Sequence, residues 1–211
     1  MERYEAGSVS GFLHLPTGTA PDGLVLTHGA GASCQSRLLM AVADAFAAAG
    51  VRVLRCDLPF RQQRRFGPPS PANAARDRAG LEAALLELRK LAPGRLFLGG
   101  HSYGGRQASI LASEQRQFCD ALLLLSYPLY SPKKPEEWRT KHFADLRTPV
   151  LFVHGTRDLF GSIEELRNAM LAIPERSELI RVQGAGHELK NGAFDVGALP
   201  ARLEQVAMKA A

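Results

Sequence analysis

The stretch Gly99-Gly100-His101-Ser102-Tyr103-Gly104-Gly105 decides the fold. It contains the pattern Gly-x-Ser-x-Gly between an apolar segment, 95–98, and a segment with helical character, 103–114. A serine in such a sharp strand-to-helix turn is forced into a strained conformation that pushes its hydroxyl out above the sheet. Glycines are needed two residues before and after it, because side chains there would clash. We predict that Ser102 is a nucleophile; the alternative is a glycine-rich turn that only packs a helix against the sheet.

Strand-like and helix-like segments alternate on both sides of this turn. Apolar runs predict strands at 23–27, 51–54, 95–98, 121–125, 149–153 and 178–182. Apolar residues at helical spacing predict helices at 33–49, 75–91, 103–114, 163–171 and 196–209. Such alternation implies right-handed crossovers and a mostly parallel sheet flanked by helices, an α/β fold. Because no repeat or long linker divides the chain, residues 1–211 are expected to form a single domain.

Two further polar residues follow predicted strands. Asp158 comes soon after 149–153, and His187 lies in the glycine-rich stretch after 178–182. A serine hydroxyl needs a base to become a good nucleophile, and a carboxylate orients that base and stabilises its charged form. The chain order Ser102, Asp158, His187 therefore predicts one catalytic site for acyl transfer. Asp57 also follows a strand and could either assist at the edge of the site or serve as a turn residue.

The turn after the strand at 23–27 is expected to complete the site. Its small residues, Gly29-Ala30-Gly31, let the backbone approach a developing negative charge closely. We predict an oxyanion hole formed by the backbone amides of Ala30 and Tyr103, with the amide of Gly31 as the alternative to that of Ala30.

The same turn allows a different interpretation, a dinucleotide-binding fingerprint. Gly29-Ala30-Gly31 follows a strand and opens a helix, but Cys34 occupies the place of the third glycine. That interpretation also leaves Ser102, Asp158 and His187 unexplained. The six histidines show no metal-ligand spacing, so neither a metal nor a cofactor is predicted.

The chain resembles the α/β-hydrolase superfamily over nearly all of its length. The stretches that carry the resemblance are 27–33, 99–105, 126–129 and 154–161. Within the superfamily it is similar to the small hydrolases related to dienelactone hydrolases, whose animal relatives include a testis-expressed protein and a subunit of a nuclear histone-acetylation complex. The resemblance implies a serine hydrolase whose nucleophile, acid and base are Ser102, Asp158 and His187. Dienelactone hydrolases proper use a cysteine where this chain has serine, so their particular activity is not implied.

The expected substrate is a small-molecule acyl ester or thioester. Residues 126–148, where many α/β-hydrolases insert a cap, are too few for a lid domain, so the site should be open and shallow. We expect Gly31, Tyr127 and Phe160 to contact the substrate, although each aromatic ring could instead be a packing residue. The second hypothesis is a non-catalytic binding scaffold, since a fold does not guarantee a function.

The amino-acid composition limits the class of protein and its expected location. Hydrophobic residues make up 45% and charged residues 22%, as in ordinary soluble globular proteins. Since no apolar run is long enough, we expect no membrane-spanning segment, and from the polar first residues we expect no secretory signal. Three cysteines without a close pair fit a reducing cytoplasm, where we expect the protein to reside.

The formal net charge of +5 has a local source. Seven arginines cluster in the segment 52–78: Arg52, Arg55, Arg61, Arg64, Arg65, Arg76 and Arg78. We interpret this segment as a solvated loop, although it could attract an anionic group. Nucleic-acid binding is not predicted, because no recognition element accompanies the arginines.

Overall fold

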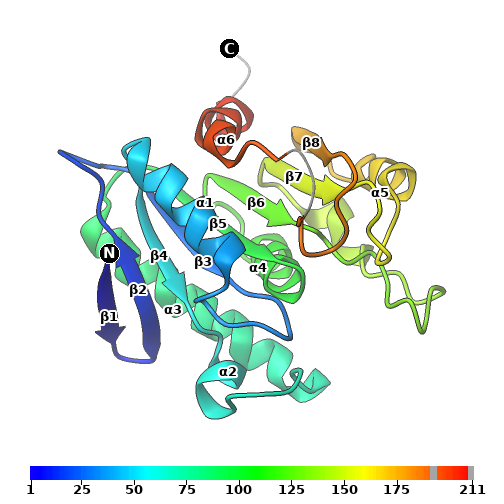
Figure 1. Ribbon diagram of the computed structural model, residues 1–211, viewed down its shortest axis with the longest axis horizontal. Helices are drawn as coiled ribbons and strands as arrows, with labels where there is room; N and C mark the ends of the chain where they lie inside the picture. The colour runs from blue at the N-terminus through cyan, green and yellow to red at the C-terminus, as the bar shows by residue number, and fades with distance from the viewer. Residues whose placement is uncertain (191–193, 209–211) are drawn as a thin grey trace.

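A computed structural model describes residues 1–190 and 194–208 of the chain (Figure 1). The strands are β1 (Glu2–Ala6), β2 (Val9–His14), β3 (Gly23–Thr27), β4 (Arg52–Cys56), β5 (Leu96–His101), β6 (Ala121–Leu125), β7 (Val150–Gly155) and β8 (Ser177–Val182). The helices are α1 (Arg37–Ala48), α2 (Pro59–Gln63), α3 (Ala74–Leu91), α4 (Tyr103–Glu114), α5 (Ile163–Met170) and α6 (Leu199–Ala207). Three short 3-10 turns lie at Pro71–Asn73, Lys141–Asp145 and Val196–Ala198.

All eight strands form one sheet in the order β1-β2-β4-β3-β5-β6-β7-β8. The first two strands are antiparallel to their neighbours, and every pairing from β4 through β8 is parallel. Because parallel strands end at the same edge, the residues that follow β3, β5, β7 and β8 meet there. The predicted α/β architecture is confirmed.

Helices cover both faces of the sheet (Figure 1). Successive strand residues point to opposite faces, so Leu24 and Leu26 pack in the cluster with α1 and α6, whereas Val25 packs in the cluster with α3, α4 and α5. The central strands are therefore buried on both sides, which accounts for their continuous apolar sequences.

The predicted elements are present, with different ends in several cases. Helix α1 begins at Arg37 rather than Ser33, because the Ser36 hydroxyl accepts a hydrogen bond from the Leu39 amide and caps it there. The closing segment is a 3-10 turn followed by α6, and its predicted end at Lys209 lies outside the described residues. The hairpin β1–β2 and the short helix α2 were not predicted. Strand β1 is mostly exposed at the sheet edge and lacks an apolar run.

The interval between β6 and β7 holds a loop and one 3-10 turn, so the fold has no large cap, as predicted. Among the described residues, no helix has the length and apolar character needed to cross a membrane.

His142, in the turn that packs on α4, gives stability a dependence on pH. Its Nε2 lies 2.8 Å from the Ser109 hydroxyl, and burial, together with the charge of Arg106, lowers its pKa to about 4. As pH falls below the ordinary value of 6.5 the unfolded chain takes up this proton first, so stability falls with pH down to about 4. We expect His142→Gln to flatten the slope of stability against pH in this window by up to about 1.4 kcal/mol per pH unit, measured by urea unfolding. An unchanged slope would contradict the assignment.

Candidate active site

Ser102 lies in the turn between β5 and α4, with a backbone conformation that few non-glycine residues adopt. Its φ is 52° and its ψ is −116°. The surrounding structure holds it there, since its amide donates to the Leu125 carbonyl over 2.8 Å and its carbonyl accepts from the Arg106 amide over 3.0 Å. The strain predicted from the sequence is confirmed, and strain of this kind concentrates at functional sites.

The glycines around Ser102 are required by close backbone contacts. A Cβ on Gly104 would lie 2.6 Å from the His28 carbonyl oxygen, and one on Gly100 would lie 2.8 Å from the Gly104 carbonyl carbon. A Cβ on Gly29 would lie 3.4 Å from that of Ser102. The turn after β3 is therefore pressed directly against the serine turn.

The structure brings Ser102, His187 and Asp158 into one line of hydrogen bonds. The Ser102 hydroxyl oxygen is 2.8 Å from His187 Nε2, and His187 Nδ1 is 2.8 and 3.0 Å from the two oxygens of Asp158. The Asp158 side chain is fully buried, whereas that of His187 is 17% exposed. The Phe160 amide donates to Asp158 Oδ1 over 2.8 Å, which fixes the carboxylate. The imidazole thus joins a buried carboxylate to an accessible hydroxyl.

Neighbouring rings hold His187 in this orientation. The Phe160 ring stacks on it with centroids 4.1 Å apart. His101 donates from Nε2 to the His187 carbonyl over 2.9 Å, and His154 donates from Nε2 to the Gly161 carbonyl over 2.8 Å, with Asp158 Oδ2 3.6 Å away. Burial lowers the pKa of both His101 and His154, so both are neutral near pH 7. Neither ring therefore places a positive charge beside His187.

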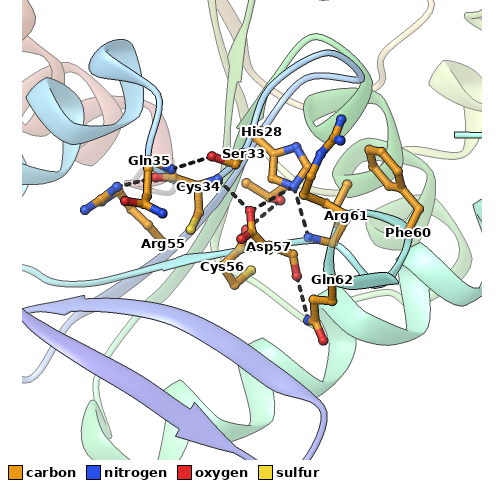
Figure 2. A network of polar contacts seen from close by, with 12 residues as sticks. His28, Ser33, Cys34, Gln35, Arg55, Cys56, Asp57, Phe60, Arg61 and Gln62 are labelled. Carbon is orange, nitrogen blue, oxygen red and sulfur yellow. Dashed lines mark hydrogen bonds and ion pairs between the residues drawn. The ribbon is translucent and has the colours of Figure 1, made fainter. Parts of the chain in front are cut away.

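His28 and Asp57 support the turn at residues 29–32 (Figure 2). His28 donates from Nδ1 to the Gly29 carbonyl over 2.9 Å, while its Nε2 accepts from the Leu58 amide over 3.1 Å. Burial lowers the pKa of His28, consistent with this neutral tautomer. Asp57 accepts from the Cys34 amide over 2.7 Å and lies 3.4 Å from His28. Asp57 therefore holds backbone beyond the turn and does not belong to the line of hydrogen bonds through His187.

Arg61 fixes the next peptide of the same turn. Its guanidinium donates to the Ala30 carbonyl over 2.7 Å and also binds the carbonyls of Arg64, Arg65 and Gly67 over 2.8–3.1 Å. His28 and Arg61 thus hold two consecutive carbonyls, those of Gly29 and Ala30. In the described ranges, the amides of Ala30 and Gly31 donate no hydrogen bond and remain available.

The interpretation of the arginine-rich segment as a solvated loop is wrong for two of its arginines. Arg61 is 7% exposed and Arg55 is 1% exposed. Arg55 donates from Nε to His14 over 2.8 Å and contacts the Cys34 carbonyl (Figure 2). Both guanidiniums serve as internal supports for backbone carbonyls, which the local sequence did not reveal.

A pocket of about 740 Å³ opens above Ser102. Its lining includes predicted site residues, namely Ala30, Gly31, Ser102, Tyr103, Phe160 and His187. The prediction for Tyr127 is wrong: this side chain is fully buried, donates to the Arg139 carbonyl over 2.7 Å and does not line the pocket. Its neighbour Pro128 lines the pocket instead.

Asp77, which was not predicted, anchors the first residue of α4. It accepts from the Tyr103 hydroxyl over 2.7 Å and from the Phe60 amide over 3.0 Å. Its burial in α3 raises its pKa. In the sequence Asp77 lies between Arg76 and Arg78 in a predicted helix and looks solvated. No local pattern indicates that its side chain is buried. Within the residues described, no group of three or more histidine, cysteine, aspartate or glutamate side chains could hold a metal ion.

A strained serine between a parallel strand and a helix, at the carboxyl edge of a sheet of this order, defines an α/β-hydrolase fold. A family model described as "Alpha/beta hydrolase domain" matches residues 21–210, and the chain belongs to that family. This membership replaces the dinucleotide-binding interpretation of Gly29-Ala30-Gly31.

Solved structures share the fold at low sequence identity. A dienelactone hydrolase from Anabaena variabilis is 18% identical, with a TM-score of 0.75 over 97% of this chain and 96% of that one. An alpha-beta serine hydrolase homologue from Coxiella burnetii is 17% identical, with a TM-score of 0.73 over 93% and 90%. A serine hydrolase without lid from Xanthomonas campestris is 18% identical, with a TM-score of 0.70 over 93% and 87%.

Proposed function

We propose that this protein is a serine hydrolase that cleaves small carboxylic esters or thioesters through an acyl-Ser102 intermediate. The observation that carries the proposal is the hydrogen-bonded line from the Ser102 hydroxyl through His187 to buried Asp158, at the base of an accessible pocket. A non-catalytic scaffold would need neither this line nor a strained serine.

The proposed reaction has two halves. His187 Nε2 takes the Ser102 proton as the serine oxygen attacks the carbonyl carbon, and then gives that proton to the departing alcohol or thiol. In the second half His187 takes a proton from water, the resulting hydroxide attacks the acyl carbon, and the proton returns to Ser102. Asp158 keeps the proton on His187 Nδ1 and stabilises the imidazolium formed in each half.

Negative charge on the carbonyl oxygen would be held by two backbone amides. The Tyr103 amide begins α4 and has no intrahelical acceptor. The second donor in this proposal is the Ala30 amide, whose peptide is fixed through the Gly29 carbonyl; the Gly31 amide, fixed through the Ala30 carbonyl, is the alternative. Donors held in advance stabilise the transition state without reorganising during the reaction.

Arg61 tests the contribution of this fixed turn. We expect Arg61→Met to lower kcat about tenfold with a smaller change in KM, because the Ala30 carbonyl loses its anchor and the peptide that carries the Gly31 amide, next to the Ala30 amide, loses its alignment. Arg61→Lys should recover part of the loss, since an ammonium can still reach one carbonyl. Steady-state kinetics on folded variants make the comparison, and a change in KM alone would argue against a role in the transition state.

A substrate panel tests the proposed function. Nitrophenyl esters and acyl thioesters of graded chain length should show saturable turnover with the wild-type protein, and Ser102→Ala should reduce every rate to background. Equal rates in the two proteins would remove Ser102 from the mechanism. Because the fold has no large cap, short and medium acyl chains should be accepted more readily than long ones.

A further inference from the structure

Two arginines line the pocket beside Ser102. Arg106 lies in the first turn of α4, where its amide donates to the Ser102 carbonyl over 3.0 Å, and its side chain lines the same pocket as Ser102. Arg139 comes from the segment between β6 and β7, where its amide donates to the Leu129 carbonyl over 2.8 Å and its carbonyl accepts from Tyr127. Hydrogen bonds thus fix the backbone of both arginines whose side chains line the pocket.

Neither arginine has a carboxylate partner within the part of the chain that the structure describes. Five other arginines form ion pairs with acidic side chains: Arg3, Arg78, Arg95, Arg176 and Arg202. The Nε of Arg106 is buried and has no hydrogen-bond partner. Glu188, the acidic residue of the pocket lining, is exposed and forms no ion pair with either arginine. The pocket therefore contains two guanidiniums that form no ion pair with any acidic side chain among the described residues.

The positive charges of the two arginines also act on each other. Burial lowers the pKa of Arg139, and the charge of Arg106 acts in the same direction, whereas Tyr127 and the exposed Glu137 act in the opposite direction. Half-buried like charges raise the free energy of the folded state unless an anion lies between them. A guanidinium pair offers planar, paired donors that match the oxygens of a carboxylate or phosphate.

We propose that Arg106 and Arg139 form a subsite for an oxyanion carried by the substrate, a carboxylate or a phosphate. The inference rests on the proposed function and narrows its substrate class to anionic esters or thioesters. The anionic group is bound at the pocket wall while the acyl carbon lies at Ser102.

Matched substrate pairs test the subsite and show whether the bound anion is a carboxylate on the acyl group or a phosphate on the leaving group. Mono-4-nitrophenyl glutarate is compared with 4-nitrophenyl pentanoate for a carboxylate on the acyl group. Acetyl-coenzyme A is compared with the acetyl thioester of N-acetylcysteamine for phosphate on the leaving group. We expect the wild-type kcat/KM to be about tenfold or more higher for the charged member of at least one pair, because hydrogen bonds to a charged group stabilise a complex by about that factor. The pair that shows the preference identifies the anion.

Variants assign that preference to residues. Arg106→Gln and Arg139→Gln should each lower the ratio of charged to neutral kcat/KM about tenfold, and Arg106→Lys should retain part of it. Arg116→Gln, an exposed arginine just beyond α4, is the matched control and should keep the wild-type ratio. Thermal melting verifies that each variant is folded. A wild-type ratio near one in both pairs, or a ratio unchanged in both glutamine variants, would overturn the subsite while leaving the hydrolase proposal intact.

Binding without turnover provides an independent measurement. Calorimetry with Ser102→Ala and the charged esters measures affinity when hydrolysis cannot occur. Affinity that falls when Arg106→Gln or Arg139→Gln is added supports the subsite even if the hydrolase proposal fails. If neither change alters the affinity, the subsite proposal is contradicted.

Discussion

Replacing His187 with alanine is expected to lower kcat for ester hydrolysis by about 10⁴-fold or more. The hydroxyl of Ser102 would lose the base that lies 2.8 Å away, and nothing else in the line of hydrogen bonds could accept its proton. The thermal midpoint should change little, because the ring is partly exposed and lies in a loop after β8. Initial rates with a nitrophenyl ester and a melting curve on the same sample provide the measurement.

Added imidazole is the control for His187→Ala. A free imidazole that enters the space beside Phe160 should restore part of the rate, since the serine and its proposed amide donors are otherwise unchanged. A mutant that hydrolyses esters at the wild-type rate would exclude His187 from the mechanism.

Asp158→Asn is expected to have the second large effect, about 10⁴-fold on kcat. An amide at this position has nearly the same shape but presents its NH2 group, which favours the tautomer of His187 with its proton on Nε2. That proton would face the Ser102 hydroxyl, and the imidazole could no longer act as a base. Asp145→Asn is the matched control, since Asp145 is exposed on the turn after β6 and should leave the rate unchanged. Equal rates for Asp158→Asn and the control would show that the carboxylate only packs beneath the ring.

The serine turn and the order of the strands could be predicted because their causes are local. A Cβ on Gly104 would lie only 2.6 Å from the His28 carbonyl oxygen, and any chain that makes this turn must keep small residues there. The positions of Asp158 and His187 followed from one rule, that the residues after parallel strands gather at one edge of the sheet. The joining of these side chains by hydrogen bonds could be stated only from the structure.

Other features depended on partners far away in the sequence. Whether Tyr127 faces the pocket or the core is decided by the Arg139 carbonyl that binds its hydroxyl. Arg61 is in an arginine-rich segment that looks solvated, and its burial is possible because the Ala30 carbonyl and three others surround the guanidinium. The pocket arginines, Arg106 and Arg139, lie outside the segment where the sequence concentrates its positive charge. Burial of a charged group depends on acceptors that only the folded chain brings together.

A fluorophosphonate probe measures directly whether Ser102 is an activated nucleophile. We expect the wild-type protein to take up about one mole of probe per mole, with the added mass on the peptide that contains Ser102. Ser102→Ala should take up none, although it folds and melts like the wild type. Folded wild-type protein that remains unlabelled at millimolar probe, or equal labelling of the alanine variant, would contradict the account.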